Sequence, residues 1–107
     1  MFVNCTPHAI TIRLATGDVT IPPSGNVARC QATEVAAGER DGIPLVTRVM
    51  GEVQGLPASV EGTVYVVGSM VLDAAQGRSD LAAPDTGTTA IREGGQVKAV
   101  IRLVVKS

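Results

Sequence analysis

The chain has 107 residues, enough for one domain with a single core but not for two. Its net charge of −1 and the absence of any basic run argue against a DNA or RNA polymer as partner. No apolar run reaches the ~20 residues that a membrane helix needs. Apolar residues make up 45% of the sequence, yet only Phe2 and Tyr65 are aromatic. So much apolar surface on a short chain predicts a homo-oligomer; the alternative is a monomer with an ordinary apolar surface.

The first ten residues lack the basic start and long apolar core of a signal peptide, which predicts a cytoplasmic protein. Cys5 and Cys30 are too few and too far apart for a metal knuckle. A reducing cytosol favours two free thiols there, with a disulfide as the alternative. Because His8 is the only histidine, we expect no zinc cluster, no His-based triad and no cofactor.

Short apolar runs separated by turn residues predict strands through the first half of the chain. Glycine bounds the polar segment 36 to 42, which predicts an exposed loop or hairpin end. The runs that predict strands cover residues 2 to 5, 9 to 14, 19 to 21, 26 to 35 and 43 to 53.

The second half contains the most apolar run, residues 64 to 67, which predicts a central strand covered on both faces. A short helix is expected over residues 69 to 76, then a polar loop over 78 to 92 and a last strand over 96 to 106. Because the helix comes late, after a series of strands, the class is mainly β or α+β. We predict a single β-rich domain, residues 1 to 107, with about six strands in a mixed sheet or partly closed barrel.

Polar residues cluster immediately after the central strand, which makes this region the best candidate for a binding site. A helix that follows a buried strand presents free N–H groups to an anion, and Ser69 adds a hydroxyl. Arg78 and Arg92 could each make two-pronged contacts with phosphate or carboxylate. In the alternative, Ser69 is only a helix cap and Arg78 pairs with Asp80. Neither a P-loop nor a dinucleotide-binding glycine motif is present.

Other polar side chains extend the candidate site. Tyr65 either fills core volume or stacks on a base, and His8 either faces a pocket or is incidental. Asn4 and Thr6, beside it, could simply bond to local backbone. The remaining candidates are Asp80 and three hydroxyl donors that are equally typical of a solvent-facing turn, Thr86, Thr88 and Thr89.

Five segments in order, NCTPHAITI, IPPSGNVARC, GEVQGLP, VYVVGSMV and GRSDLAAPDTG, span nearly the whole chain. Together they resemble a family of small phage- and prophage-encoded proteins with an N-x-T-P-H start and an R-x-D-L-x-x-P loop. Most of that family has no assigned function. The resemblance therefore implies a viral origin and a compact β-rich domain.

Three functions follow as hypotheses. The first is sequestration, without turnover, of a small anionic ligand such as a cyclic nucleotide or ADP-ribose derivative used in bacterial anti-phage defence. This hypothesis rests on the arginines, the helix start and the lack of a catalytic cluster, together with analogy to other phage proteins. The second is a structural, assembly or protein-binding role, with residues 78 to 92 as a subunit contact. The third is a small nucleotide hydrolase.

Overall fold

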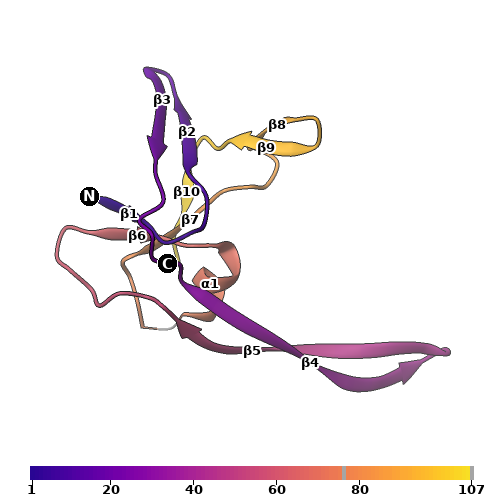
Figure 1. Cartoon of the computed structure of the whole chain (residues 1–107). Coiled ribbons are helices and arrows are strands. Elements are labelled where there is room, and N and C mark those ends of the chain that lie inside the picture. The colour runs from indigo at the N-terminus through magenta and orange to yellow at the C-terminus, as the bar shows by residue number, and fades with distance from the viewer. Residues whose placement is uncertain (76, 107) are drawn as a thin grey trace.

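The computed structural model describes residues 1 to 75 and 77 to 106, and its fold is mainly β. The centre is a four-stranded sheet in the order β1 (Phe2–Asn4), β6 (Val64–Val66), β7 (Leu81–Pro84), β10 (Leu103–Val104). The first three strands are parallel and β10 is antiparallel to β7, so the sheet is mixed. Three hairpins extend from this centre (Figure 1). The predicted fold class is confirmed.

Strand β6 lies inside the sheet, as its apolar sequence predicts. Tyr65, Val66 and Val67 are each no more than 5% exposed. The single helix of the described residues, α1 (Ser69–Ala74), follows directly and contributes Val71 and Leu72 to the same core cluster as Tyr65. A buried strand followed at once by a covering helix explains why the polarity of the sequence changes abruptly at residue 68.

The three hairpins are two-stranded sheets that share little of this core. They are β2 (Ile10–Leu14) with β3 (Gly17–Ile21), β4 (Arg29–Arg40) with β5 (Ile43–Gln54), and β8 (Ile91–Glu93) with β9 (Gln96–Ala99). The β4–β5 hairpin, residues 29 to 54, is by far the longest, and we call it the arm. Figure 1 shows the arm running away from the rest of the molecule, which gives the chain a longest dimension of 53 Å.

The predicted exposed loop or hairpin end over residues 36 to 42 is a hairpin end, in which the strand extends further than predicted. Strand β4 continues to Arg40, which pairs with Ile43 across a two-residue turn. Asp41 and Gly42 form this turn with φ values of 51° and 79°, the backbone of a type I′ turn that suits the twist of the strands. The strand was predicted too short because both faces of the outer arm are exposed in the single chain, so polarity does not mark where the strand ends.

Two further predictions were wrong in the last third of the chain. The polar loop over 78 to 92 contains β7, a buried strand, and β8. The expected last strand is broken, because β9 ends at Ala99 and β10 begins at Leu103 in a different sheet. Between them Val100 is buried. The helix was expected to end at Gln76, which lies outside the described residues; the helix itself ends at Ala74.

Gly55 sits where the arm joins the body, and it allows the backbone to pass very close to a neighbour. A Cβ at Gly55 would lie 2.5 Å from the Val27 carbonyl oxygen, and its φ is +82°. Gly62 has nearly the same φ, +80°, with nothing within 4 Å. We therefore expect Gly55→Ala to lower the free energy of unfolding by about 2 kcal/mol and Gly62→Ala by about 1 kcal/mol. Urea denaturation of both variants measures the difference, and equal losses would contradict the close contact.

Candidate functional site

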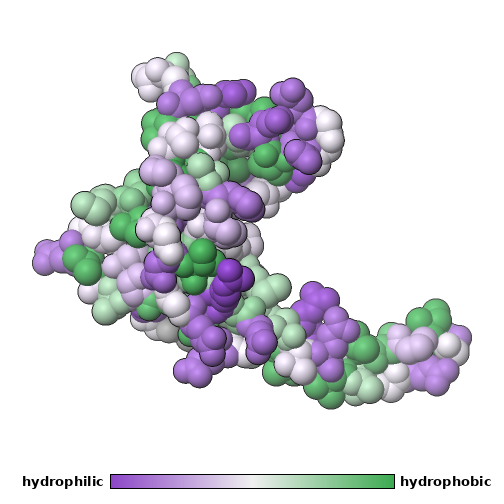
Figure 2. Space-filling view, in the orientation of Figure 1, coloured by the Kyte–Doolittle hydropathy of each residue, from purple (hydrophilic) through white to green (hydrophobic). Residues whose placement is uncertain are grey.

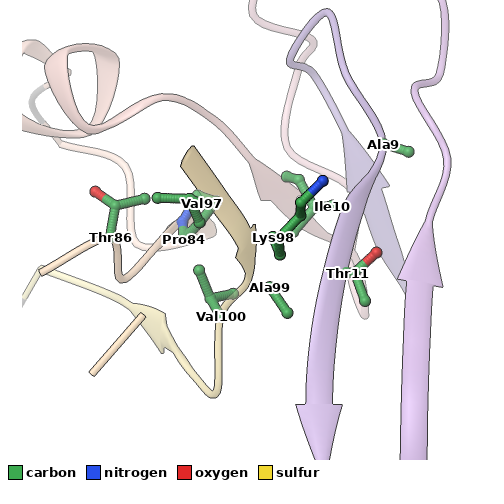
Figure 3. Close-up of a pocket in the computed structure, with 9 residues that line it drawn as sticks. All are labelled: Ala9, Ile10, Thr11, Pro84, Thr86, Val97, Lys98, Ala99 and Val100. Carbon is green, nitrogen blue, oxygen red and sulfur yellow. The ribbon is translucent and has the colours of Figure 1, made fainter. Parts of the chain in front are cut away.

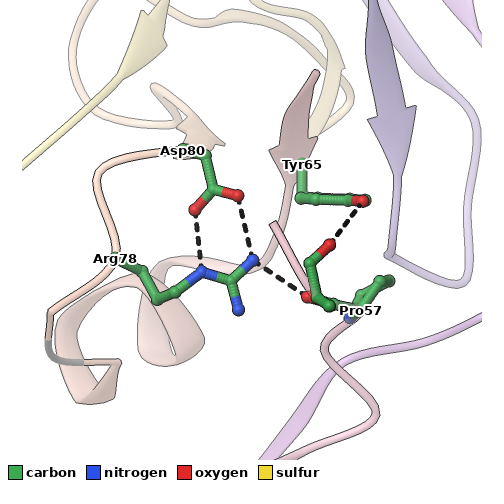
Figure 4. Close-up of polar contacts among 5 residues, drawn as sticks. Pro57, Tyr65, Arg78 and Asp80 are labelled. Carbon is green, nitrogen blue, oxygen red and sulfur yellow. Dashed lines mark hydrogen bonds and ion pairs between the residues drawn. The ribbon is translucent and has the colours of Figure 1, made fainter. Parts of the chain in front are cut away.

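Arg78, the first candidate anion ligand, is held in a clamp within the chain. Its Nε donates to Asp80 Oδ1 at 2.8 Å and its Nη2 donates to Asp80 Oδ2 at 2.9 Å. The same Nη2 donates to the Pro57 carbonyl oxygen at 2.9 Å (Figure 4). This two-pronged, charge-assisted arrangement is the strong form of the arginine–carboxylate pair. The sequence left two alternatives for Arg78, an anion ligand or a partner of Asp80. The structure contains the pair with Asp80.

Tyr65 completes the clamp from the central strand. The Arg78 guanidinium carbon lies 5.9 Å from the centre of the Tyr65 ring, and the Tyr65 hydroxyl donates to the Ala58 carbonyl oxygen at 3.0 Å. The Arg78 and Asp80 side chains are only 22% and 16% exposed. Hydrogen bonds from the Arg78 guanidinium lower the pKa of Asp80 from 3.8 to about 2. The clamp fastens residues 57 and 58 to the strand and loop beside them.

A second polar group surrounds Asp85 and includes one of the predicted residues, Thr89. Asp85 Oδ2 accepts from Arg102 Nε at 2.7 Å and from the Thr89 hydroxyl at 3.3 Å. The hydrogen bond from Arg102, with that from the Gly87 amide, lowers the pKa of Asp85. Close by in sequence, Arg92 donates to the Thr86 carbonyl oxygen at 2.6 Å. The sequence contains no signal for the Arg102 contact, which joins residues 17 apart, one just after β7 and the other just before β10.

The other predicted residues lie apart from both groups. Ser69 is exposed and is the first residue of α1; the N-cap is Gly68, and no side chain caps the helix. Thr88 is exposed in a turn. His8 has an exposed side chain, and only its backbone carbonyl takes part in a described hydrogen bond. The candidates are therefore not gathered around one point in the single chain.

Asn4 explains the N-x-T-P-H segment in structural terms. Its side chain is 1% exposed, and its amide donates to the carbonyl oxygens of His8 at 2.8 Å and Ile21 at 3.0 Å. Its Oδ1 accepts from the Thr6 amide at 2.9 Å and from the Thr6 hydroxyl at 2.6 Å. Asn4 thus joins the end of β1 to the end of β3. The sequence also predicted, as one alternative, that Asn4 and Thr6 bond to nearby backbone groups, and the structure contains these hydrogen bonds.

A small hollow and a wider hollow on the described surface each leave out most of the predicted residues. The first, of about 160 Å³, lies between β2 and β9 (Figure 3). Its lining is mostly aliphatic, includes Lys98, and contains one predicted residue, Thr86. Pockets for drug-sized ligands are about 300 to 1,000 Å³. The second, of about 450 Å³, lies at the root of the arm and contains none of the predicted residues; Arg29, Gln31, Thr33, Gly51, Glu52 and Gln54 line it.

The described residues include no group of three or more His, Cys, Asp or Glu side chains placed to hold a metal ion. Cys5 and Cys30 are free thiols, and burial raises the pKa of Cys5. Within the described ranges, helix length and apolar content fall short of what crossing a membrane requires. No family model, curated protein or solved structure matches this chain.

Proposed function

We propose that the protein is a self-assembling structural or assembly component, and that its arm is the part that packs against other copies. The observation that carries this proposal is the surface of the single chain, 7310 Å². A compact monomer of 11.0 kDa exposes about 5,600 Å². The excess, about 1,700 Å², is roughly twice what one partner contributes to a standard protein–protein interface. The radius of gyration, 16.3 Å, also exceeds the ~13 Å of a compact domain of this length.

The arm is the longest of the three extended hairpins and contributes to this excess. A two-stranded hairpin is marginally stable by itself in water, and among the described residues no third strand or helix covers the outer part of the arm. Figure 2 shows hydrophobic side chains along the arm, away from the body. Contact with another copy would cover them. The large exposed apolar residues of the arm are Val35, Ile43, Leu45, Val46, Val49 and Met50.

The geometry favours assembly over nucleotide sequestration. In the single chain the Arg78 guanidinium already binds Asp80 and the backbone, and Arg92 already donates to the Thr86 carbonyl oxygen. An anion would have to displace these contacts. A viral origin, which the resemblance to small phage and prophage proteins implies, is compatible with a part in building or completing a virus particle, and we propose that this takes place in the cytoplasm of the bacterial host.

Sedimentation velocity of the purified protein at tens of micromolar tests the proposal. We expect the wild-type mass to be a multiple of 11.0 kDa and Val49→Asp to sediment as a monomer, because a charge would be buried in the contact. Val60→Asp is the matched control, since Val60 is a similarly exposed valine outside the arm, and it should keep the oligomer. A monomeric wild type, or an oligomer that Val49→Asp leaves intact, would refute the proposal. Depletion of cyclic nucleotides or ADP-ribose derivatives by the intact oligomer would favour sequestration instead.

A further inference from the structure

The two faces of the arm differ in charge. Side chains alternate along a strand and cross-strand partners share a face. Glu34 and Arg48 are partners and form an ion pair at 3.5 Å, so they define one face, the charged face. The opposite face, which we call the uncharged face, has no ionisable residue in the middle of the outer arm. There its residues are Thr33 paired with Val49, Val35 paired with Thr47, and, further along β5, Leu45. At the tip the face ends at Ile43, which pairs with Arg40.

The uncharged face ends in polar groups of different kinds. At the root it continues into the 450 Å³ hollow, because Thr33 lines that hollow together with Arg29 and Glu52. At the tip the face carries Arg40, next to Asp41 of the turn, and both residues are exposed. From root to tip, the face is therefore polar and hollowed, then aliphatic, then charged.

From this order we infer that the arm of one copy binds the arm of a second copy, uncharged face to uncharged face and in antiparallel directions. In such packing the aliphatic middle sections of the two uncharged faces contact each other. Each charged tip then lies over the hollow at the root of the partner's arm. Arg29 then meets the Asp41 carboxylate, and Glu52 meets Arg40. A twofold axis near Val35 relates the two copies, so the contact is closed and self-complementary.

Parallel packing fits less well. It would bring the two tips together and the two roots together, so that identical charged groups face each other, whereas antiparallel packing brings opposite charges together. This inference rests on the proposed function, since it names the surface by which the copies associate. It specifies a dimer as the basic unit of the assembly.

Charge complementation at Val35 tests the face-to-face contact. Val35→Lys and Val35→Glu should each weaken dimerisation by on the order of a hundredfold, because like charges meet near the axis. An equimolar mixture should restore the dimer mass. Val35 is 51% exposed in the single chain, so unchanged circular dichroism spectra should show that both variants fold. If neither substitution weakens the oligomer, or if the mixture stays monomeric, the face-to-face contact is refuted.

Oxidative crosslinking tests the direction. With Cys30 replaced by alanine, Asp41→Cys together with Gln31→Cys should give a disulfide-linked dimer, since the tip of one copy meets the root of the other. In the same Cys30→Ala protein, Asp41→Cys alone should not crosslink, and Cys30→Ala without further change is the background control. Crosslinking of Asp41→Cys to itself would show parallel arms. An oligomeric wild type that fails both tests would refute this inference alone, whereas a monomeric wild type would refute the proposed function.

Discussion

Replacing Asn4 with alanine is expected to lower the free energy of unfolding by about 4 kcal/mol. The substitution removes both side-chain donors that bind the His8 and Ile21 carbonyl oxygens and the acceptor that binds Thr6. The surrounding position is buried, so these groups lose their partners without gaining water in exchange. Chemical denaturation monitored by circular dichroism measures the loss.

Asn26→Ala provides the comparison for this prediction. Asn26 is exposed and also binds backbone, with its amide donating to the Gly55 carbonyl oxygen at 2.9 Å. Water can replace that contact, so the expected loss is below about 1 kcal/mol. Similar losses in the two variants would mean that Asn4 does not join β1 to β3 in the way its hydrogen bonds indicate.

Arg78→Ala is expected to lower the free energy of unfolding by about 3 kcal/mol at pH 7. It leaves the Asp80 carboxylate, 16% exposed, without its cation, and the Pro57 carbonyl oxygen without its donor. The matched control is Arg13→Ala, which removes an arginine paired with Asp18 in an exposed hairpin and should change stability little. If Arg78→Ala were as stable as the wild type, the clamp would be incidental and Arg78 would again be a candidate ligand for an anion.

Acid titration gives the same pair a second readout. Because the folded pKa of Asp80, about 2, lies below its ordinary value of 3.8, the charged carboxylate stabilises the folded state. This contribution, about 2 kcal/mol, is complete above roughly pH 5 and is lost as the pH falls through 4 towards 2. The wild type should therefore lose more stability over this interval than Arg78→Ala. Parallel curves for the two proteins would contradict the lowered pKa.

Local sequence determined the features that depend on neighbouring residues. Residues 64 to 67 have no charged or strongly polar side chain, a pattern typical of a strand that is covered on both faces. In the structure these residues form or directly follow the inner strand β6. The change after residue 68 marks the start of α1. The pairing of Arg78 with Asp80 was also visible as an alternative, since the two residues are only two positions apart. In each instance the interacting groups are close along the chain.

Tertiary structure alone decided the features that join distant segments. Strand β7 is a short, alanine-rich segment with little strand character of its own, and parallel pairing with β6 makes it a buried strand. Asp85 finds Arg102 only because β10 pairs with β7. The arm shows the limit most clearly, since the segment 36 to 40 is polar and becomes strand by hydrogen bonding to β5. Backbone pairing is nearly independent of side-chain type, so it is decided by which strands meet.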